Sequence, residues 1–253
     1  MLAYPALAVV GFVAGLVDAA VGGGGLIQVP GLFSILSDRS PASLFGTNKF
    51  ASICGTSMAS WRYARGVDIA WRLVLPTALM AFAFSFVGAT VVSLIPKALM
   101  RPIVLGLLAF MFIYTLRKPD FGHMHRPSRV GRREFLLALV IGGGIGFYDG
   151  FFGPGTGSFL IFLFIRLFGF DFLRASASSK IVNWATNLGA LCLFIPKGDV
   201  MFQFAIPMAA AQIAGSVVGS RMALSGGTQF IRKLFLVIVV VLIAKLGWDT
   251  LHG

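Results

Sequence analysis

The sequence predicts an all-α, polytopic membrane protein that consists of two homologous halves. Hydrophobic residues make up 57% of its 253 residues and charged residues 12%, whereas a soluble domain carries about 25% charged residues. Residues 73–95, 98–116 and 231–248 are almost free of charge and roughly long enough to cross a hydrocarbon core of about 30 Å. Glycine clusters interrupt further apolar segments at corresponding positions of the halves. Because backbone groups in lipid must be satisfied internally, these segments are predicted to be helices.

One constant offset relates the two halves. Asp18 and Asp149 lie 131 residues apart. The same separation relates other glycines, prolines and charged residues: Gly15 and Gly146, Gly22 and Gly153, Gly24 and Gly155, Lys49 and Lys180, Asp68 and Asp199, Pro76 and Pro207, Gly88 and Gly219, and Arg101 and Arg232. Such self-similarity indicates an internal repeat, with membrane halves at 1–116 and 134–253 and a basic cytoplasmic linker at 117–133.

Each half is predicted to follow one plan. An apolar helix leads into the glycine cluster; in the first half it covers residues 2–20 and is expected to be retained rather than cleaved as a signal peptide. A short apolar segment follows, at 26–36 or 158–168, which is too short to span the membrane comfortably. Three longer helices complete each half, near 43–61, 72–95 and 98–116 in the first and near 174–195, 203–222 and 230–248 in the second.

The basic residues predict that the halves have opposite orientations. Cytoplasmic loops carry an excess of Lys and Arg, which places the linker and residues 62–72 in the cytoplasm. In the second half the basic loops are 166–174 and 221–233, whose first-half counterparts fall outside. This switch is typical of an inverted repeat. It requires the two helices on either side of each glycine cluster to count as two short crossings. The membrane is expected to be the bacterial cytoplasmic (inner) membrane.

The glycine clusters are the first candidate for a binding site near the midplane. Broken backbone is tolerated at membrane depth only where it is buried in protein or lines a cavity, and matched breaks in two halves are typical of a transporter site. A helix that begins after a break aims free N–H groups at an anion; close helix packing is the alternative reason for glycine. The candidate residues are Gly22, Gly23, Gly24, Gly25, Gly153, Gly155, Thr156 and Gly157.

Two lysines inside membrane segments are the second candidate. Lys49 and Lys180 each lie early in a predicted helix, and a charged residue within the membrane indicates function by default. The alternative is that both lie near helix ends and extend to the membrane surface. Hydroxyl and amide groups nearby either ligate an oxyanion or join helices by hydrogen bonds; they belong to Thr47, Asn48, Ser178, Ser179, Asn183 and Asn187.

Two aspartates precede the glycine clusters. Asp18 and Asp149 have three open interpretations: a proton carrier, a salt bridge to one of the two lysines, or a cap of the short helix after the break. Asp68 and Asp199 lie in loops and are expected to cap the helices that follow them.

Several motifs recur in one order along the chain. They are Asp18 with Gly22-Gly23-Gly24-Gly25 and Pro30, then Gly46-Thr47-Asn48 and Gly66-Val67-Asp68, and in the second half Asp149 with Gly153-Pro154-Gly155 and Ser178-Ser179-Lys180. This order resembles the sulfite exporter TauE/SafE family, also called the 4-toluene sulfonate uptake permease family, over nearly the whole chain. The resemblance implies a membrane exporter of sulfite, sulfonates or related organosulfur anions. Ser178 stands where family members often have Thr, and the two glycine clusters differ, so the half-sites are expected to contact a ligand unequally.

The leading prediction is a secondary transporter that works by alternating access around an anion site between the halves. No ATP-binding loop of the G-x-x-x-x-G-K-[ST] type is present. The alternative is an anion channel whose pore is lined by Lys49 and Lys180.

Other classes of protein are excluded by missing motifs. The aspartates lack the Gly-x-Gly-Asp pattern of intramembrane proteases, and zinc and serine-nucleophile motifs are absent, so no enzyme, cofactor or metal is predicted. The net charge of +12 comes mostly from segment ends, which points to topology rather than nucleic acid. The expected partners are a small anionic substrate and the lipid bilayer, and a homo-oligomer stays open.

Overall fold

The computed structural model describes residues 3–94 and 131–226. The predicted helices at 98–116 and 230–248 and most of the linker lie outside the described residues. The described part is helical throughout, with short turns between helices, and contains no strand. The prediction of an all-α chain is therefore confirmed for this part.

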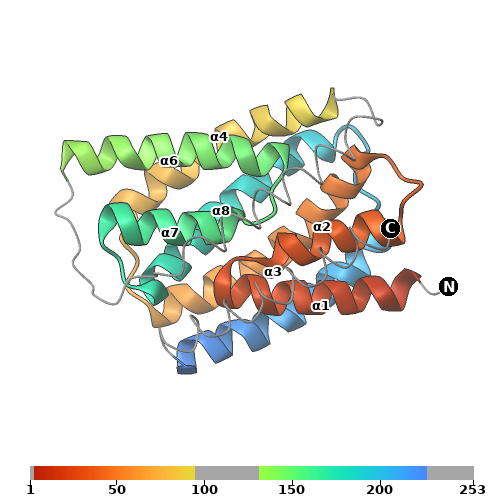
Figure 1. Ribbon diagram of the computed structural model, residues 1–253, viewed down its shortest axis with the longest axis horizontal. Coiled ribbons are helices and arrows are strands. Elements are labelled where there is room, and N and C mark those ends of the chain that lie inside the picture. Colours follow the sequence, from red (N-terminus) through yellow and green to blue (C-terminus); the bar gives the residue numbers. More distant parts are fainter. Residues whose placement is uncertain (1–2, 95–130, 227–253) are drawn as a thin grey trace, which may run out of the picture.

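The helices follow the predicted plan in both halves (Figure 1). The first half contains α1 (Ala3–Val21), α2 (Gly24–Ile35), α3 (Pro41–Gly66) and α4 (Trp71–Ser93), and the second contains α6 (Arg132–Phe151), α7 (Thr156–Phe168), α8 (Phe172–Phe194) and a last described helix, Phe202–Gly226. The short segments after the glycine clusters, α2 and α7, have 12 and 13 residues, which is too few to span a bilayer.

Several helices have the length and surface of membrane spans. In the described part, α1, α4, α6 and helix Phe202–Gly226 are long and apolar enough to cross a membrane. Large apolar side chains on all four are exposed, for example Val9 at 62%, Leu79 at 63%, Val140 at 72% and Ile206 at 58%. An exposed apolar surface of this extent is expected where lipid is the solvent. The chain is a polytopic membrane protein.

The helices before and after each glycine break fold back on each other as hairpins. Gly24 lies against the carbonyl oxygen of Ala14, and Gly31 lies against the side chain of Val10, so α2 runs antiparallel to α1. In the second half the hydroxyl of Tyr148 on α6 donates to the carbonyl oxygen of Pro154 in the break, at 2.6 Å. The hairpins enter the bundle from opposite ends, α1–α2 from the right and α6–α7 from the left in Figure 1.

The long helices α3 and α8 begin with side-chain caps at matched positions. Ser40 precedes α3, and its Oγ accepts a hydrogen bond from the backbone N–H of Ser43 at 3.1 Å. Asp171 precedes α8 and accepts from the N–H of Arg174 at 2.8 Å. The capping residues Ser40 and Asp171 are again 131 residues apart, so the repeat extends to the local signals that start these helices.

Two polar contacts tie the start of each of these helices to the end of the other. The hydroxyl of Ser43 at the start of α3 donates to Asp199, beyond the end of α8, at 3.5 Å. Arg174 at the start of α8 pairs with Asp68, beyond the end of α3, at 3.0 Å. The two helices therefore run antiparallel. The prediction that Asp68 caps the next helix is wrong, because the cap position of α4 is Ala70 and has no side-chain bond. Asp199 accepts a hydrogen bond from Ser43, and this contact also joins the two halves.

The close contacts between helices recur with the halves exchanged. On α1, α4, α6 and helix Phe202–Gly226, glycines touch the backbone of a helix from the other half. The matched contacts are Gly88 with Phe147 and Gly219 with Leu16, Gly142 with Thr77 and Gly11 with Met208, and Gly146 with Ala81 and Gly15 with Gln212. The two contacts of each matched pair are related by the 131-residue offset.

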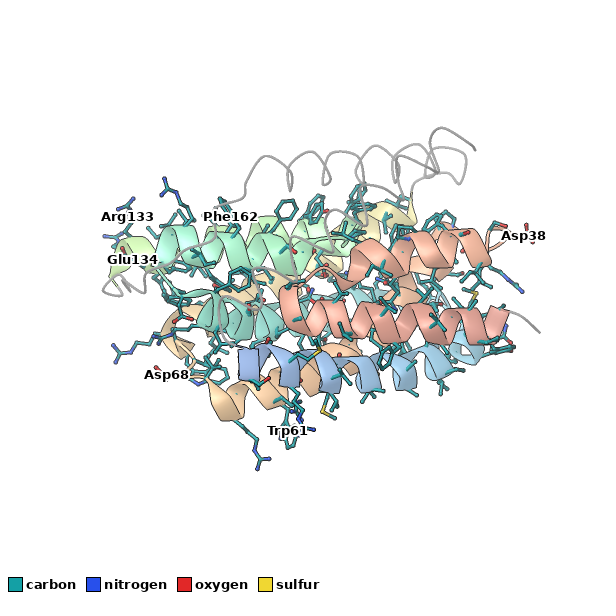
Figure 2. The ribbon with its side chains drawn as sticks, turned by 60° about the horizontal axis from the view of Figure 1, so that its bottom comes forward. Asp38, Trp61, Asp68, Arg133, Glu134 and Phe162 are labelled. Carbon is teal, nitrogen blue, oxygen red and sulfur yellow. The ribbon has the colours of Figure 1, made fainter. Side chains whose placement is uncertain are left out.

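Basic side chains collect at one end of the bundle. This end contains the end of α3, the starts of α4, α6 and α8, and the ends of α7 and helix Phe202–Gly226. Figure 2 shows Asp68 and Arg133 there and Asp38 at the opposite end. The arginines at this end are Arg62, Arg65, Arg72, Arg132, Arg133, Arg166, Arg174 and Arg221. The opposite end, as far as it is described, has Arg39 and Lys197 with Asp38 and Asp199.

A methyl group at the matched helix crossings should destabilise the protein. Gly88→Ala and Gly219→Ala place a Cβ against a backbone carbonyl, and we expect each to lower stability by about 1–3 kcal/mol, as overpacking does. Gly144→Ala is the matched control, because Gly144 is exposed on α6 and no described atom lies within 4 Å of an added Cβ. Thermal unfolding in detergent measures the difference; equal stability of Gly88→Ala and Gly144→Ala would contradict the close crossing.

Candidate functional site

Two buried ion pairs join the halves near the glycine breaks. Nζ of Lys49 on α3 lies 2.6 Å from Oδ2 of Asp149 on α6. Nζ of Lys180 on α8 lies 2.9 Å from Oδ2 of Asp18 on α1. Each lysine therefore pairs with the aspartate of the other half, and the two pairs are related by the same offset as the helix contacts.

Both lysines lie deep inside the protein. Each is eight residues beyond the first residue of its helix, Pro41 or Phe172, which corresponds to about 12 Å along the axis. The side chain of Lys49 is 2% exposed and that of Lys180 is 0% exposed. The alternative that they extend to the membrane surface is therefore wrong for this structure.

Of the three interpretations of Asp18 and Asp149, the salt bridge is the one seen in the geometry. The cap positions of α2 and α7 are Gly23 and Gly155, and neither helix has a side-chain cap bond. Neither aspartate therefore caps the short helix after its break. A role in carrying protons is not decided by this geometry and stays a prediction.

The two breaks meet tip to tip in the middle of the bundle. Gly22 has a φ of 81°, and Gly153 and Gly155 have φ of 97° and 84°, a left-handed region that favours glycine. A Cβ on Gly22 would collide with the backbone of Gly157, and one on Gly25 would crowd Pro154. The breaks thus need glycine both for their backbone angles and for their close approach.

The start of α2 and the start of α7 both face this meeting point. The first N–H groups of a helix have no partner inside the helix, and the helix dipole places partial positive charge there. The Lys49 ammonium lies against the second break, 3.0 Å from the position that a Cβ on Gly153 would take. The centre of the bundle therefore combines lysine ammonium groups with two helix N-termini.

A small cavity of about 20 Å³ lies between the two breaks. It is lined by Asp18, Gly22, Gly25, Asn48, Lys49, Ser52, Asp149, Gly153, Gly155, Thr156, Gly157, Asn183 and Asn187. Both halves contribute to this wall, through α1, the two breaks, α3, α6 and α8. Most of the residues predicted from the sequence are thus brought together at one place.

The other predicted residues lie beside the cavity without lining it. Gly23 and Gly24 pack inside the first hairpin, against Val17 and against Ala14 and Asp18. The hydroxyl of Thr47 accepts from the backbone N–H of Met201, and the hydroxyl of Ser179 donates to the carbonyl of Ser176. Ser178 is buried. Lys180 lies behind Asp18, to which it donates at 2.9 Å.

Ser52 lines the cavity and was missed by the sequence prediction. Its hydroxyl donates to Oε1 of Gln28 at 3.2 Å, and Nε2 of Gln28 donates to Gln212 at 3.0 Å. Both glutamines are buried. Ser52 is the counterpart of Asn183 at the 131-residue offset, so applying the repeat to the predicted residue Asn183 would have found it.

Two amide atoms on the cavity wall have no hydrogen-bond partner among the described residues. They are Oδ1 of Asn48 and Nδ2 of Asn187, and both are buried. Leaving a buried polar atom unpaired costs about 1–3 kcal/mol, so such atoms are expected to bind a ligand or water. One atom accepts and the other donates hydrogen bonds, and both point to a polar occupant of the cavity.

The geometry does not suggest a metal site. Among residues 3–94 and 131–226 no group of three or more His, Cys, Asp or Glu side chains is placed to hold an ion. Cys54 and Cys192 are both free. The chemistry that the site offers is that of ammonium, carboxylate, amide, hydroxyl and backbone N–H groups.

Comparison with known proteins places this architecture in a family. The family described as "Sulfite exporter TauE/SafE" matches the chain over residues 7–246. The chain belongs to this family. The resemblance inferred from the motifs is confirmed, and the protein is a multi-pass membrane transporter, not an enzyme.

The curated relatives that the chain matches are named as probable membrane transporter proteins. The chain is 36% identical over 246 residues to "Probable membrane transporter protein ORF9" of Sinorhizobium sp, covering 97% of this chain and 93% of that protein. It is 35% identical over 244 residues to "Probable membrane transporter protein YfcA" of Escherichia coli K12, covering 96% and 89%. A protein of Methanocaldococcus jannaschii, "Probable membrane transporter protein MJ0441", is 27% identical over 206 residues, covering 77% and 73%. No solved structure gives a significant match.

Removing one charge of the buried Lys49–Asp149 pair should cost much more than removing both. Lys49→Met leaves the Asp149 carboxylate unpaired, and we expect a loss of about 3–5 kcal/mol in stability. The double variant Lys49→Met, Asp149→Asn removes both charges and should recover most of this loss.

The pair of Arg174 and Asp68 is the control for this cycle, because its carboxylate is at the surface. The side chain of Asp68 is 89% exposed, so Asp68→Asn should change stability by no more than about 1 kcal/mol. Thermal unfolding in detergent compares the variants. A double variant no more stable than Lys49→Met would contradict a charge-pair role for these residues.

Proposed function

We propose that this TauE/SafE chain is a secondary transporter of small organosulfur or sulfur oxyanions, such as sulfite or sulfonates, across the bacterial cytoplasmic membrane. Transport proceeds by alternating access around an anion site between the two repeats, in the direction of export. The observation that carries this proposal is the convergence of the buried Lys49 and two helix N-termini on one cavity, with Lys180 paired to Asp18 on the cavity wall. Polar side chains at membrane depth are typical of a substrate pathway.

The donor set suits a sulfur oxyanion. Sulfite and sulfonates present several acceptor oxygens around one sulfur, and ammonium and backbone N–H groups are donors that form strong hydrogen bonds to anionic oxygens. Asn187 adds an amide N–H group that has no partner in the described part of the chain. The substrate class itself follows from the family description "Sulfite exporter TauE/SafE", since the relatives' names give no substrate.

An inverted repeat accounts for the way in which the halves dock. Three features support it: the hairpins enter from opposite ends, α3 and α8 run antiparallel, and the glycine contacts recur with the halves exchanged. The end of the bundle that is rich in arginine is the cytoplasmic end on the positive-inside rule. Two such repeats can exchange conformations around a fixed central site.

An anion channel is the second candidate, and two observations disfavour it. Each lysine is neutralised by an aspartate at hydrogen-bond distance, whereas a conducting pore needs an anion to enter favourably and leave easily. The central cavity is also small. Discrete single-channel currents carried by sulfite in planar bilayers would favour the channel, and slow saturable flux without such currents favours the transporter.

Sulfur oxyanions should stabilise the purified protein through the central lysines. We expect sulfite, thiosulfate or methanesulfonate to raise the melting temperature of the wild type, because ligands that bind the folded state stabilise it. Lys49→Gln should lose this shift, and Lys180→Gln should reduce it through Asp18. Lys197→Gln is the control, because Lys197 is exposed and bonds Ser93 away from the cavity.

The outcomes of the ligand measurement test the binding site and the substrate class separately. Equal shifts in the wild type and Lys49→Gln would remove this lysine from the binding site. If carboxylates raise the melting temperature and sulfur oxyanions do not, the proposed substrate class is wrong, but an anion site is still supported.

Labelling from the two sides of the membrane tests the orientation. In a variant without Cys54 and Cys192, we expect Asp38→Cys to react with a membrane-impermeant maleimide added outside spheroplasts. Arg133→Cys should react only after permeabilisation, because it lies at the arginine-rich end (Figure 2). Labelling of Arg133→Cys in intact spheroplasts would contradict the proposed orientation.

A further inference from the structure

The two ion pairs differ in how they meet the cavity. Lys49 and Asp149 both line it, whereas in the second pair Asp18 lines it and Lys180 does not. In the described part of the chain, the Lys49–Asp149 pair is therefore the one whose two charges both face the cavity. An anion that binds in the cavity reaches the ammonium of Lys49 before that of Lys180.

The charges around Asp149 leave no spare positive charge for an arriving anion. Among the described residues, Lys49 on α3 pairs with Asp149, and Asp18 and its partner Lys180 stand on the other side of the cavity. Tyr148, next to Asp149, donates its hydroxyl to the carbonyl of Pro154. With all four charged groups ionised, the site is neutral, so a monovalent anion would make it negative in a buried setting.

The small volume of the cavity also indicates that an anion cannot bind beside the intact Lys49–Asp149 pair. A volume of about 20 Å³ accommodates about one water molecule, and a sulfonate group with its three oxygens is larger. A sulfonate that contacts the Lys49 ammonium meets the Asp149 carboxylate, which lies 2.6 Å from Nζ. Substrate and carboxylate are therefore competitors for one lysine.

We propose that Asp149 takes up one proton when a monovalent sulfonate replaces it on Lys49, and that the proton and the anion are carried together. This inference rests on the proposed anion transport at this site. The proton comes from water and converts the carboxylate to a carboxylic acid, while Lys49 keeps its proton and shifts its hydrogen bond from Oδ2 to a sulfonate oxygen. The site is neutral before and after the exchange, and the new O–H group is a donor that faces the anion.

Methanesulfonate is the probe, because it carries one negative charge at every physiological pH and cannot supply the proton itself. In the wild type we expect its Kd to fall about tenfold for each unit by which the pH falls between about pH 8 and pH 6, as linkage to one bound proton requires. Proton release or uptake in weakly buffered protein solution should show about one proton taken up per anion bound.

Two matched variants assign the proton. Asp149→Asn imitates the protonated carboxyl group, so it should bind methanesulfonate with a Kd that is independent of pH and about tenfold or more lower than that of the wild type at pH 8. Asp18→Asn removes the corresponding carboxylate of the other pair. Its Kd is expected to change, because Asp18 lines the cavity, but the tenfold dependence on pH should remain, because Asp149 still competes with the anion for Lys49. If either variant fails to fold, the wild-type slope and proton count still decide whether a proton is coupled.

Each outcome bears on a different proposal. A wild type that binds methanesulfonate with a Kd independent of pH overturns the proton coupling and leaves the proposed function standing. Loss of the pH dependence in Asp18→Asn but not in Asp149→Asn overturns the assignment to Asp149. A wild type that binds neither methanesulfonate nor any other sulfur oxyanion overturns the proposed substrate class, and the coupling falls with it.

Discussion

The rest of this structure depends on the two buried ion pairs that join its halves. A lysine or aspartate buried at membrane depth is strongly unfavourable unless it is paired. Here Lys49 pairs with Asp149, and Lys180 pairs with Asp18. Each half supplies one ammonium and one carboxylate to its partner. The halves must therefore dock before either pair exists, and the same docking creates the central cavity.

Close backbone approach makes this docking geometrically feasible. Lipid removes the hydrophobic drive between helices, so association relies on van der Waals packing and interhelical hydrogen bonds. Glycines provide that packing on both sides, because Gly88 and Gly219 let helices from opposite halves touch along their backbones. At the centre the same residue type lets the two breaks meet, Gly22 against Gly157. The helix packing and the central cavity thus both depend on glycine residues.

The two half-sites are not equal, although their frames match. The first half places Ser52 on the cavity wall and connects it to Gln28 and Gln212. The second half places Asn183 at the matched position and adds Thr156 and Asn187, while Asn48 of the first half also lines the cavity. The matched positions Ser52 and Asn183 therefore present a hydroxyl from the first half and an amide from the second. On the proposed function, this difference would help to orient an asymmetric anion such as a sulfonate.

The sequence by itself determined the class of the protein, indicated the repeat and predicted most of the residues that line the central cavity. Apolar run lengths decide that lipid is the solvent, and one offset that relates aspartates, lysines and glycines decides the repeat, because both are properties of spacing along the chain. Spacing could not decide which lysine meets which aspartate, that Asp68 bonds Arg174 rather than capping α4, or that Lys180 lies behind Asp18. Those depend on how the halves dock, since each contact joins residues at least 100 positions apart. Tertiary structure therefore decided the pairing, and with it which charges reach the cavity.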